Sequence, residues 1–197
     1  MTINYHVYSQ KELMLHAMVG RVITNWARLE NQLLRLIAWG LRISPTDAAA
    51  ITSSFKTFSL TLDFTQAVCK PRVQYPVFVN SLFDVIRELS GDRNFIAHTE
   101  VIGHGAGEPE EIDWSAVDPH IGPAIQEYLT GNTAKREPMD IAEVHEIAED
   151  IQHLVSITMN FISALNEGQP LLETYQKPIA LRRPRLAERR SNSGKAR

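Results

Sequence analysis

Apolar residues that recur in alternating steps of three and four limit most strongly what this chain can fold into. In the first fifth of the sequence, the longest such run takes in Leu15, Val19, Val22, Trp26, Leu29, Leu33, Leu36 and Gly40. This spacing places every member on one face of an α-helix. The run therefore predicts a helix over 11–41 with one buried face, and it indicates an all-α domain.

Three further runs with the same spacing predict three more long helices. The Ser-Pro-Thr-Asp sequence at 44–47 has the N-cap serine, first-turn proline and acid that favour a helix start, and the run behind it continues to Pro71. Another run begins after Pro76 and reaches Ile96, and the last extends over 141–165. Four long amphipathic helices predict an antiparallel four-helix bundle.

Two segments lack this periodicity. Residues 103–138 are rich in Gly, Pro, Asp and Glu, and they predict a long irregular insertion between the third and fourth helices, with one short helix over 123–129. Residues 169–197 are rich in Pro and Arg and are expected to form a mobile basic tail. The predicted organisation is one bundle domain over 1–168 followed by this tail.

Charge and cysteine content narrow the class of protein. The net charge is −3, and the part from position 182 onward has seven basic residues and one acid, so the rest is near −9. An acidic body does not suit a protein that coats nucleic acid, so any RNA contact should be local. The single cysteine, Cys69, lies on an apolar helix face and is interpreted as core. Together with the lack of a signal peptide or membrane span among the first thirty residues, it predicts a cytoplasmic protein.

Arg93, Asn94 and His98 are the strongest candidates for chemistry. Histidine transfers protons near neutral pH, and the planar guanidinium of arginine matches phosphate oxygens. The amide of Asn94 both donates and accepts hydrogen bonds, so it can orient a substrate or the histidine. The set suits cleavage of a phosphodiester that carries its own nucleophile, the 2′-hydroxyl of RNA, without a metal or other cofactor.

Helical geometry separates Arg93 from His98. Residues five apart on a straight helix point about 140° apart, so the two side chains do not share a face. Either the helix bends near Gly91 or ends before His98, or a second copy of the motif completes the site across a twofold axis. We favour the second copy.

The stretch from Arg93 to His98 resembles the Arg-polar-x-x-x-His motif of HEPN domains, which are all-helical bundles common in prokaryotic toxin–antitoxin and phage-defence systems. The stretch from Trp26 to Glu30 also resembles theirs, and the resemblance covers about residues 11–167. It implies a homodimer whose two motifs meet in a cleft and cut RNA without metal. It also implies that a partner protein, such as an antitoxin, accompanies a toxin or defence effector.

The resemblance implies a role for each motif residue. His98 would be the general acid/base, Arg93 would stabilise the pentacoordinate phosphate, and Asn94 would orient the reacting groups. Some members of the family have lost catalysis, so a catalytically silent module that binds a partner protein or a nucleotide stays open. A purely structural bundle stays open as well, with Arg93 buried against Glu30 and His98 interacting with the end of its helix.

Other candidates are weaker. Asp92 and Glu30 are predicted to support the motif. Electrostatic steering of RNA is a hypothesis for the tail arginines, which are Arg182, Arg183, Arg185, Arg189 and Arg190. Three histidines and three nearby acids have no compact metal-binding spacing, and no metal site is predicted from them: His98, His104, His120, Glu100, Glu108 and Asp113.

Overall fold

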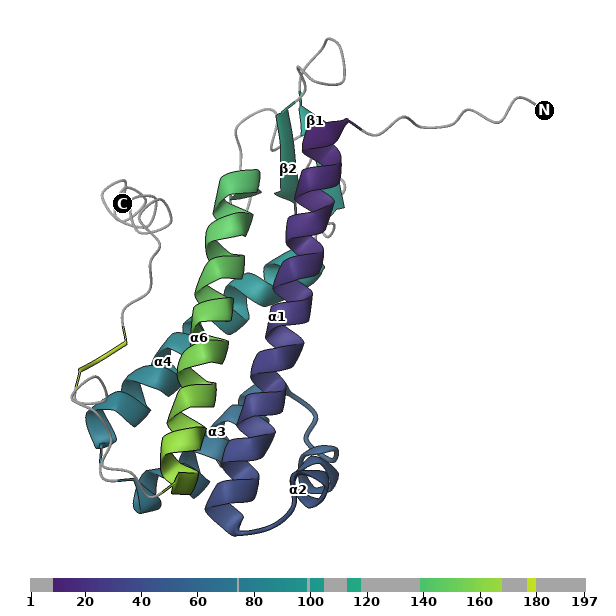
Figure 1. The fold of residues 1–197 in the computed structure, drawn as a ribbon. Coiled ribbons are helices and arrows are strands. Elements are labelled where there is room, and N and C mark those ends of the chain that lie inside the picture. The colour runs from purple at the N-terminus through teal and green to yellow at the C-terminus, as the bar shows by residue number, and fades with distance from the viewer. Residues whose placement is uncertain are drawn as a thin grey trace, which may run out of the picture. The chain divides into compact units, whose positions relative to one another are not determined.

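The structure, a computed structural model, describes residues 9–73, 75–98, 100–104, 113–117, 139–167 and 177–179. Helices dominate this part of the chain (Figure 1), and the predicted all-α class is confirmed. The helices are α1 (Gln10–Leu41), α2 (Pro45–Thr52), α3 (Phe58–Cys69), the 3-10 helix η1 (Lys70–Arg72), α4 (Pro76–Ala97) and α6 (Ile141–Glu167). The strands are β1 (Glu100–His104), β2 (Asp113–Val117) and β3 (Met139–Asp140). None of the described helices is long and apolar enough to cross a lipid bilayer.

The first predicted helix matches α1 to within one residue at its start. The stripe residues Leu15, Val22, Leu29, Leu33 and Leu36 are all fully buried. Trp26 is also in the core, where its ring lies 4.9 Å from that of Phe58. The apolar stripe was thus a sound guide to the buried face of this helix.

The prediction of a single second helix was wrong, because this segment forms two helices, α2 and α3. Residues 53–57 leave the helical conformation between α2 and α3. Here Ser53 and Ser54 donate side-chain hydrogen bonds to backbone carbonyls of the preceding turn, at 2.7 and 2.9 Å. Thr57 then caps α3 by accepting from the backbone N–H of Leu60. Hydroxyl side chains that bond the backbone compete with helix continuation, which the apolar spacing alone does not register.

The start of α2 follows the prediction from its sequence. The hydroxyl of Ser44 accepts from the backbone N–H of Asp47 at 3.1 Å, and the Asp47 carboxylate accepts in return from the backbone N–H of Ser44. This reciprocal pair is a capping box, with Pro45 in the first turn. The turn between α1 and α2 is therefore fixed at both ends.

The segment predicted as irregular contains strands. β1 pairs antiparallel with β2, and β2 pairs antiparallel with β3, so β2 is the central strand. Ala116 and Met139 face each other in register, and both are buried. The short helix predicted over 123–129 lies outside the described residues.

The predicted tail is described only at residues 177–179. There the backbone N–H of Ile179 donates to Ser81 Oγ on α4 at 2.8 Å. Ile179 is therefore held by a hydrogen bond to α4, and the mobility expected for the tail as a whole stays a prediction. The remaining tail residues, including the five arginines assigned to RNA steering, lie outside the described residues.

The chain divides into two compact units. Unit 1 comprises 1–23, 92–148 and 184–197, and unit 2 comprises 24–91 and 149–183. The described core of unit 1 includes Leu15, Val22, Phe95, Ile96, Ala116, Met139, Val144 and Ile147. The core of unit 2 contains aromatic pairs, including Phe78 with Phe161 at 5.0 Å between ring centroids.

Candidate functional site

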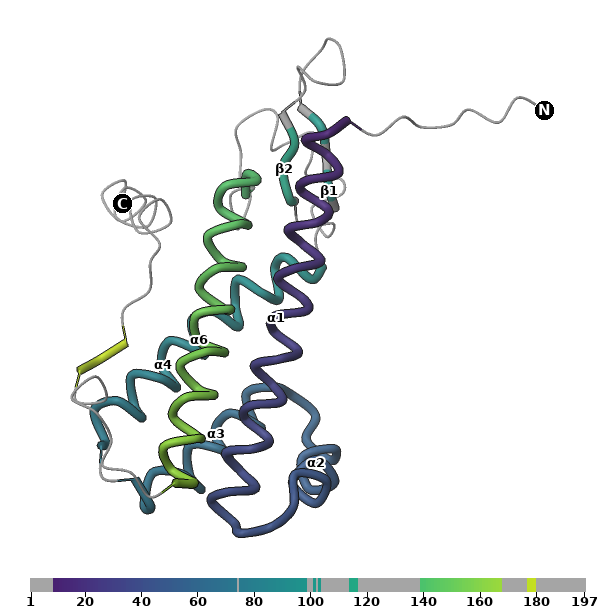
Figure 2. The backbone as a smooth tube through the Cα atoms, viewed as in Figure 1, coloured from purple at the N-terminus to yellow at the C-terminus, as the bar shows by residue number. Residues whose placement is uncertain are grey.

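The motif lies in the last turns of α4, within unit 1. The helix is continuous through Gly91 and ends at Ala97, so Gly91 does not break it. Figure 2 traces α4 as one helical tube. Phe95 and Ile96 are buried and fix the orientation of these turns, and Asp92 is only 1% exposed. A helix that is anchored on both sides of Arg93 and Asn94 presents them in a defined direction.

Arg93 and Asn94 are brought together. Arg93 Nη1 donates to Asn94 Oδ1 at 3.0 Å. Arg93 is half-buried and Asn94 is exposed, so the pair lies where the helix meets solvent. A guanidinium held by a neighbouring amide is restricted in orientation, which favours the binding of a phosphate in one geometry.

His98 is the first residue after α4. Its backbone N–H donates to the carbonyl of Phe95 at 3.2 Å, and its side chain is exposed. The imidazole makes no hydrogen bond within the described part of the chain. Of the two single-chain alternatives, a bend at Gly91 and a helix end before His98, the structure shows the helix end.

The two supporting candidates have different environments. Asp92 is buried, so its carboxylate cannot contact a substrate from the surface. Glu30 is half-buried in unit 2, and its Oε1 accepts a hydrogen bond from Trp26 Nε1 at 2.8 Å. The hypothesis that Glu30 pairs with Arg93 stays a prediction.

The described residues contain no group of three or more His, Cys, Asp or Glu side chains that could hold a metal ion. His120, Glu108 and the side chain of His104 lie outside the described residues.

Cys69 is buried as predicted, and its Sγ lies 3.9 Å from the carbonyl oxygen of Leu36. Burial raises the pKa of the Cys69 thiol to about 12, against a smaller lowering by Arg72. The thiol therefore stays protonated and unreactive at neutral pH.

One site was missed by reasoning from the sequence. In unit 2 a pocket of about 590 Å³ is lined from α1 by residues that include Gln32, Arg35 and Trp39, from the turn after α1 by Arg42, and from α6 by residues that include Ser163 and Asn166. Gln32, Arg35 and Trp39 follow one another in steps of three and four, which places them on one face of α1 beside the apolar stripe. A search for polar and aromatic stripes, as well as apolar ones, would have found this face.

Comparison of the chain with protein-family models, with curated proteins and with solved structures finds no match.

Proposed function

We propose that this protein is a metal-independent endoribonuclease whose site is assembled from two copies of the Arg93–His98 motif. In the proposed reaction the 2′-hydroxyl of RNA attacks the adjacent phosphorus, and a histidine accepts its proton. The bond from phosphorus to the 5′-oxygen of the next nucleotide breaks, and that oxygen takes up a proton. The products are a 2′,3′-cyclic phosphate and a free 5′-hydroxyl, and no redox change or metal is required.

The observation that carries this proposal is the hydrogen bond between Arg93 and Asn94 at the exposed end of a well-anchored helix. Negative charge builds up on the phosphate oxygens as the fifth bond to phosphorus forms. A guanidinium already oriented by its neighbour stabilises that charge without further reorganisation. Arg93 is half-buried, so its charge is also screened less by water than that of a fully exposed arginine.

The position of His98 supports a site built from two copies. It follows the last residue of α4 and is exposed, and its imidazole has no hydrogen-bond partner in the described residues. A general acid/base works best when a second group fixes its orientation. We propose that the second copy supplies this group, so that Arg93 of one copy and His98 of the other act on one phosphate.

The resemblance to HEPN domains extends the proposal to a biological role. A toxin or phage-defence effector, held inactive by a partner protein, is the role that the resemblance favours. The alternative, a catalytically silent module that binds a partner protein or a nucleotide, predicts no RNA cleavage under any condition. RNA cleavage assays therefore separate the two.

The wild-type protein is expected to cleave RNA in the presence of a chelating agent. The experiment incubates purified protein with a labelled single-stranded RNA and excess EDTA, and follows product formation on a denaturing gel. We expect equal rates with and without EDTA, and a 2′,3′-cyclic phosphate end, because the nucleophile belongs to the substrate. Substituting the 2′-hydroxyls of the RNA with 2′-O-methyl groups is the matched control and should abolish cleavage.

Two results would contradict this proposal. The first is cleavage of the 2′-O-methyl substrate at the same rate as the normal one, since the attacking hydroxyl is then absent. The second is cleavage that stops in EDTA and returns with a divalent cation. Light scattering on the same sample should show a dimer at micromolar concentration.

A further inference from the structure

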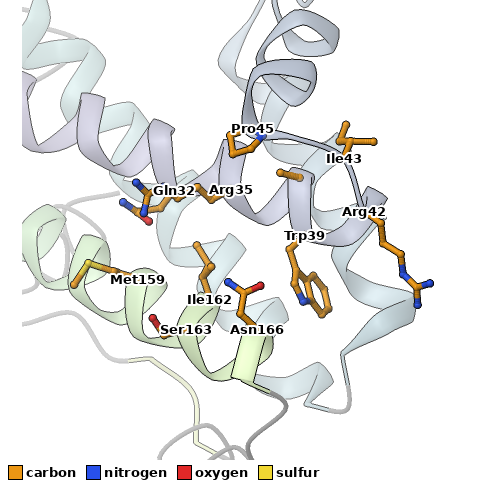
Figure 3. Close-up of a pocket in the computed structure, with 11 residues that line it drawn as sticks. Gln32, Arg35, Trp39, Arg42, Ile43, Pro45, Met159, Ile162, Ser163 and Asn166 are labelled. Carbon is orange, nitrogen blue, oxygen red and sulfur yellow. The ribbon is translucent and has the colours of Figure 1, made fainter.

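The pocket of unit 2 has the chemistry of a binding site that the proposed ribonuclease site does not use. Figure 3 shows Gln32 and Arg35 at one end, Arg42 at the other, and Trp39 between Arg42 and Asn166. Its volume of about 590 Å³ is typical of small-molecule sites. Arg42 directly follows Leu41, the last residue of α1, which lies about 9 Å from Arg35 along the helix axis. The pocket is thus an elongated groove with a cation at each end.

The charge of the groove favours an anion. Neither Arg35 nor Arg42 forms an ion pair within the described residues, and both are exposed. No acidic residue is among those that line the pocket. Two described acids elsewhere in unit 2, Asp63 and Asp84, both bind Arg87. Two planar guanidinium groups without carboxylate partners match phosphate or carboxylate oxygens.

Gln32 adds a buried group that requires a donor. Its side chain is 8% exposed, and its Oε1 is buried without a hydrogen-bond partner in the described residues. A buried carbonyl oxygen without a donor is destabilising, and most such groups in folded proteins are satisfied by protein, water or ligand. Because Gln32 lines the groove, a rotation of its side chain would bring this oxygen to a ligand N–H or O–H group.

Arg42 adopts a backbone conformation that is unfavourable for arginine. Its φ is +59°, in the left-handed region. The hydrogen bonds from Arg42 N to Trp39 O at 3.3 Å and from Ile43 N to Ala38 O at 3.0 Å form a Schellman motif, with Arg42 at the position where glycine is preferred. An arginine at this position makes the fold less stable than a glycine would. Residues held in such conformations gather at ligand sites, which is consistent with a binding role for the guanidinium.

Trp39 supplies a planar surface in the middle of the groove. It is half-buried, so part of its indole ring is open to a ligand. The rings of nucleic-acid bases stack on such surfaces with little preference between bases. Asn166 lies across from the indole in Figure 3 and offers both a donor and an acceptor to the edge of a ring.

We infer that this groove binds a nucleoside phosphate, either as a free nucleotide or as one unit of an RNA strand. The base stacks on Trp39 and donates an N–H to Gln32 Oε1, and the phosphate pairs with Arg42. A unit within a strand has a phosphate on each side, so it engages Arg35 as well. This inference stands on unit 2 alone and does not depend on the ribonuclease activity of the motif in unit 1.

Calorimetric titration of the full-length protein tests the inference with four probes: AMP, adenosine, adenosine 3′,5′-bisphosphate and a 2′-O-methyl hexa-adenylate. AMP should bind, and adenosine should bind at least about tenfold more weakly because it lacks the charged contact. Trp39→Ala and Arg42→Gly should each weaken AMP binding by about tenfold or more. Arg28→Ala is the matched control, since Arg28 is an exposed arginine of α1 that does not line the pocket, and it should bind AMP like the wild type.

The four probes and the Arg35→Ala variant distinguish a free nucleotide from one unit of an RNA strand. If the groove binds an RNA strand, Arg35→Ala should weaken the binding of the bisphosphate and of the oligonucleotide by about tenfold or more. The same substitution should weaken AMP binding much less. If it serves a free nucleotide, AMP binds more tightly than the oligonucleotide. Either pattern supports a nucleoside phosphate site.

Two stability measurements separate a binding role from a structural one. Arg42→Gly should raise the melting temperature while it weakens AMP binding, because glycine suits the left-handed conformation. Gln32→Leu should weaken AMP binding without lowering the melting temperature, because it removes a buried carbonyl that has no donor.

The inference is overturned if neither AMP nor the oligonucleotide binds below about 10 mM, or if Arg28→Ala weakens AMP binding as much as Arg42→Gly. AMP binding is measured without RNA cleavage, so a failed ribonuclease proposal leaves this test intact.

Discussion

Replacing His98 by alanine should lower the rate of RNA cleavage by about 10²- to 10⁴-fold, which is the usual contribution of a general acid/base. The expected loss is in the chemical step rather than in RNA binding. His98 is exposed just beyond the end of α4, and its imidazole bonds no other described group, so its removal should leave folding intact. Single-turnover cleavage in EDTA, with RNA affinity measured separately on the 2′-O-methyl analogue, distinguishes the two effects.

His145→Ala is the matched control for this loss. His145 is also an exposed histidine next to a buried helix face, but it lies on α6 and outside the motif. Its substitution should change the cleavage rate by less than about twofold, as expected for a surface residue away from the chemistry. Equal rates for the wild type and both variants would show that His98 has no role in catalysis.

Replacing Gly40 by alanine should destabilise the fold, although alanine is the better helix former. Gly40 is on the apolar stripe of α1, and an added Cβ would overlap Val68 Cγ1 and lie 3.4 Å from the Val68 carbonyl oxygen. Val68 is a short, buried side chain on α3 and has little freedom to move away. Overpacking of this kind costs about 1–3 kcal/mol, beyond the helix propensity that alanine adds.

Gly20→Ala should change the free energy of unfolding in the opposite direction and stabilise the fold. Gly20 is an exposed residue of the same helix, and no atom outside its own helical backbone and chain neighbours lies within 4 Å of an added Cβ. Alanine in the interior of an exposed helix stabilises by up to about 1 kcal/mol relative to glycine. Urea unfolding of both variants measures the difference, and a stabilised Gly40→Ala protein would mean that α1 and α3 do not approach closely there.

The long helices could be predicted because their information is local. The spacing of Leu15, Val22 and Leu29 fixes the buried face of α1 without reference to any other part of the chain. The break at 53–57 was missed for a related reason. Ile51, Phe55 and Phe58 keep the helical spacing across it, while the serines that end α2 act through hydrogen bonds that spacing does not encode.

The sheet could not be predicted by the same argument. β1 and β2 pair Val101 with Ala116, and β2 pairs Ala116 with Met139, more than twenty residues further along the chain. Strand pairing over such separations depends on tertiary context more than on local preference. The segment was therefore interpreted as irregular from its Gly, Pro and acidic content alone.

The candidate site was predicted in its residues but only partly in its geometry. Arg93, Asn94 and His98 could be selected as candidates by residue type and spacing, and their role in catalysis stays a prediction. The helix period gives angular separations only within a helix, whereas α4 ends at Ala97 and His98 lies beyond it. The hydrogen bond between Arg93 and Asn94 and the end of the helix at Ala97 could not be predicted from the spacing of residues. The groove around Trp39 was missed because Trp39 is next to the apolar stripe of α1 and its neighbours on that face are polar.

Mixing two inactive variants is the most direct test of the claim that each copy supplies half of the site. Arg93→Ala and His98→Ala chains are co-expressed with different tags, and RNA cleavage is measured on the purified mixed dimer and on each variant alone. If Arg93 of one copy acts with His98 of the other, a mixed dimer has one intact site of two, so the purified mixed dimer should recover about half of wild-type activity. A mixed dimer no more active than the single variants would contradict the shared site.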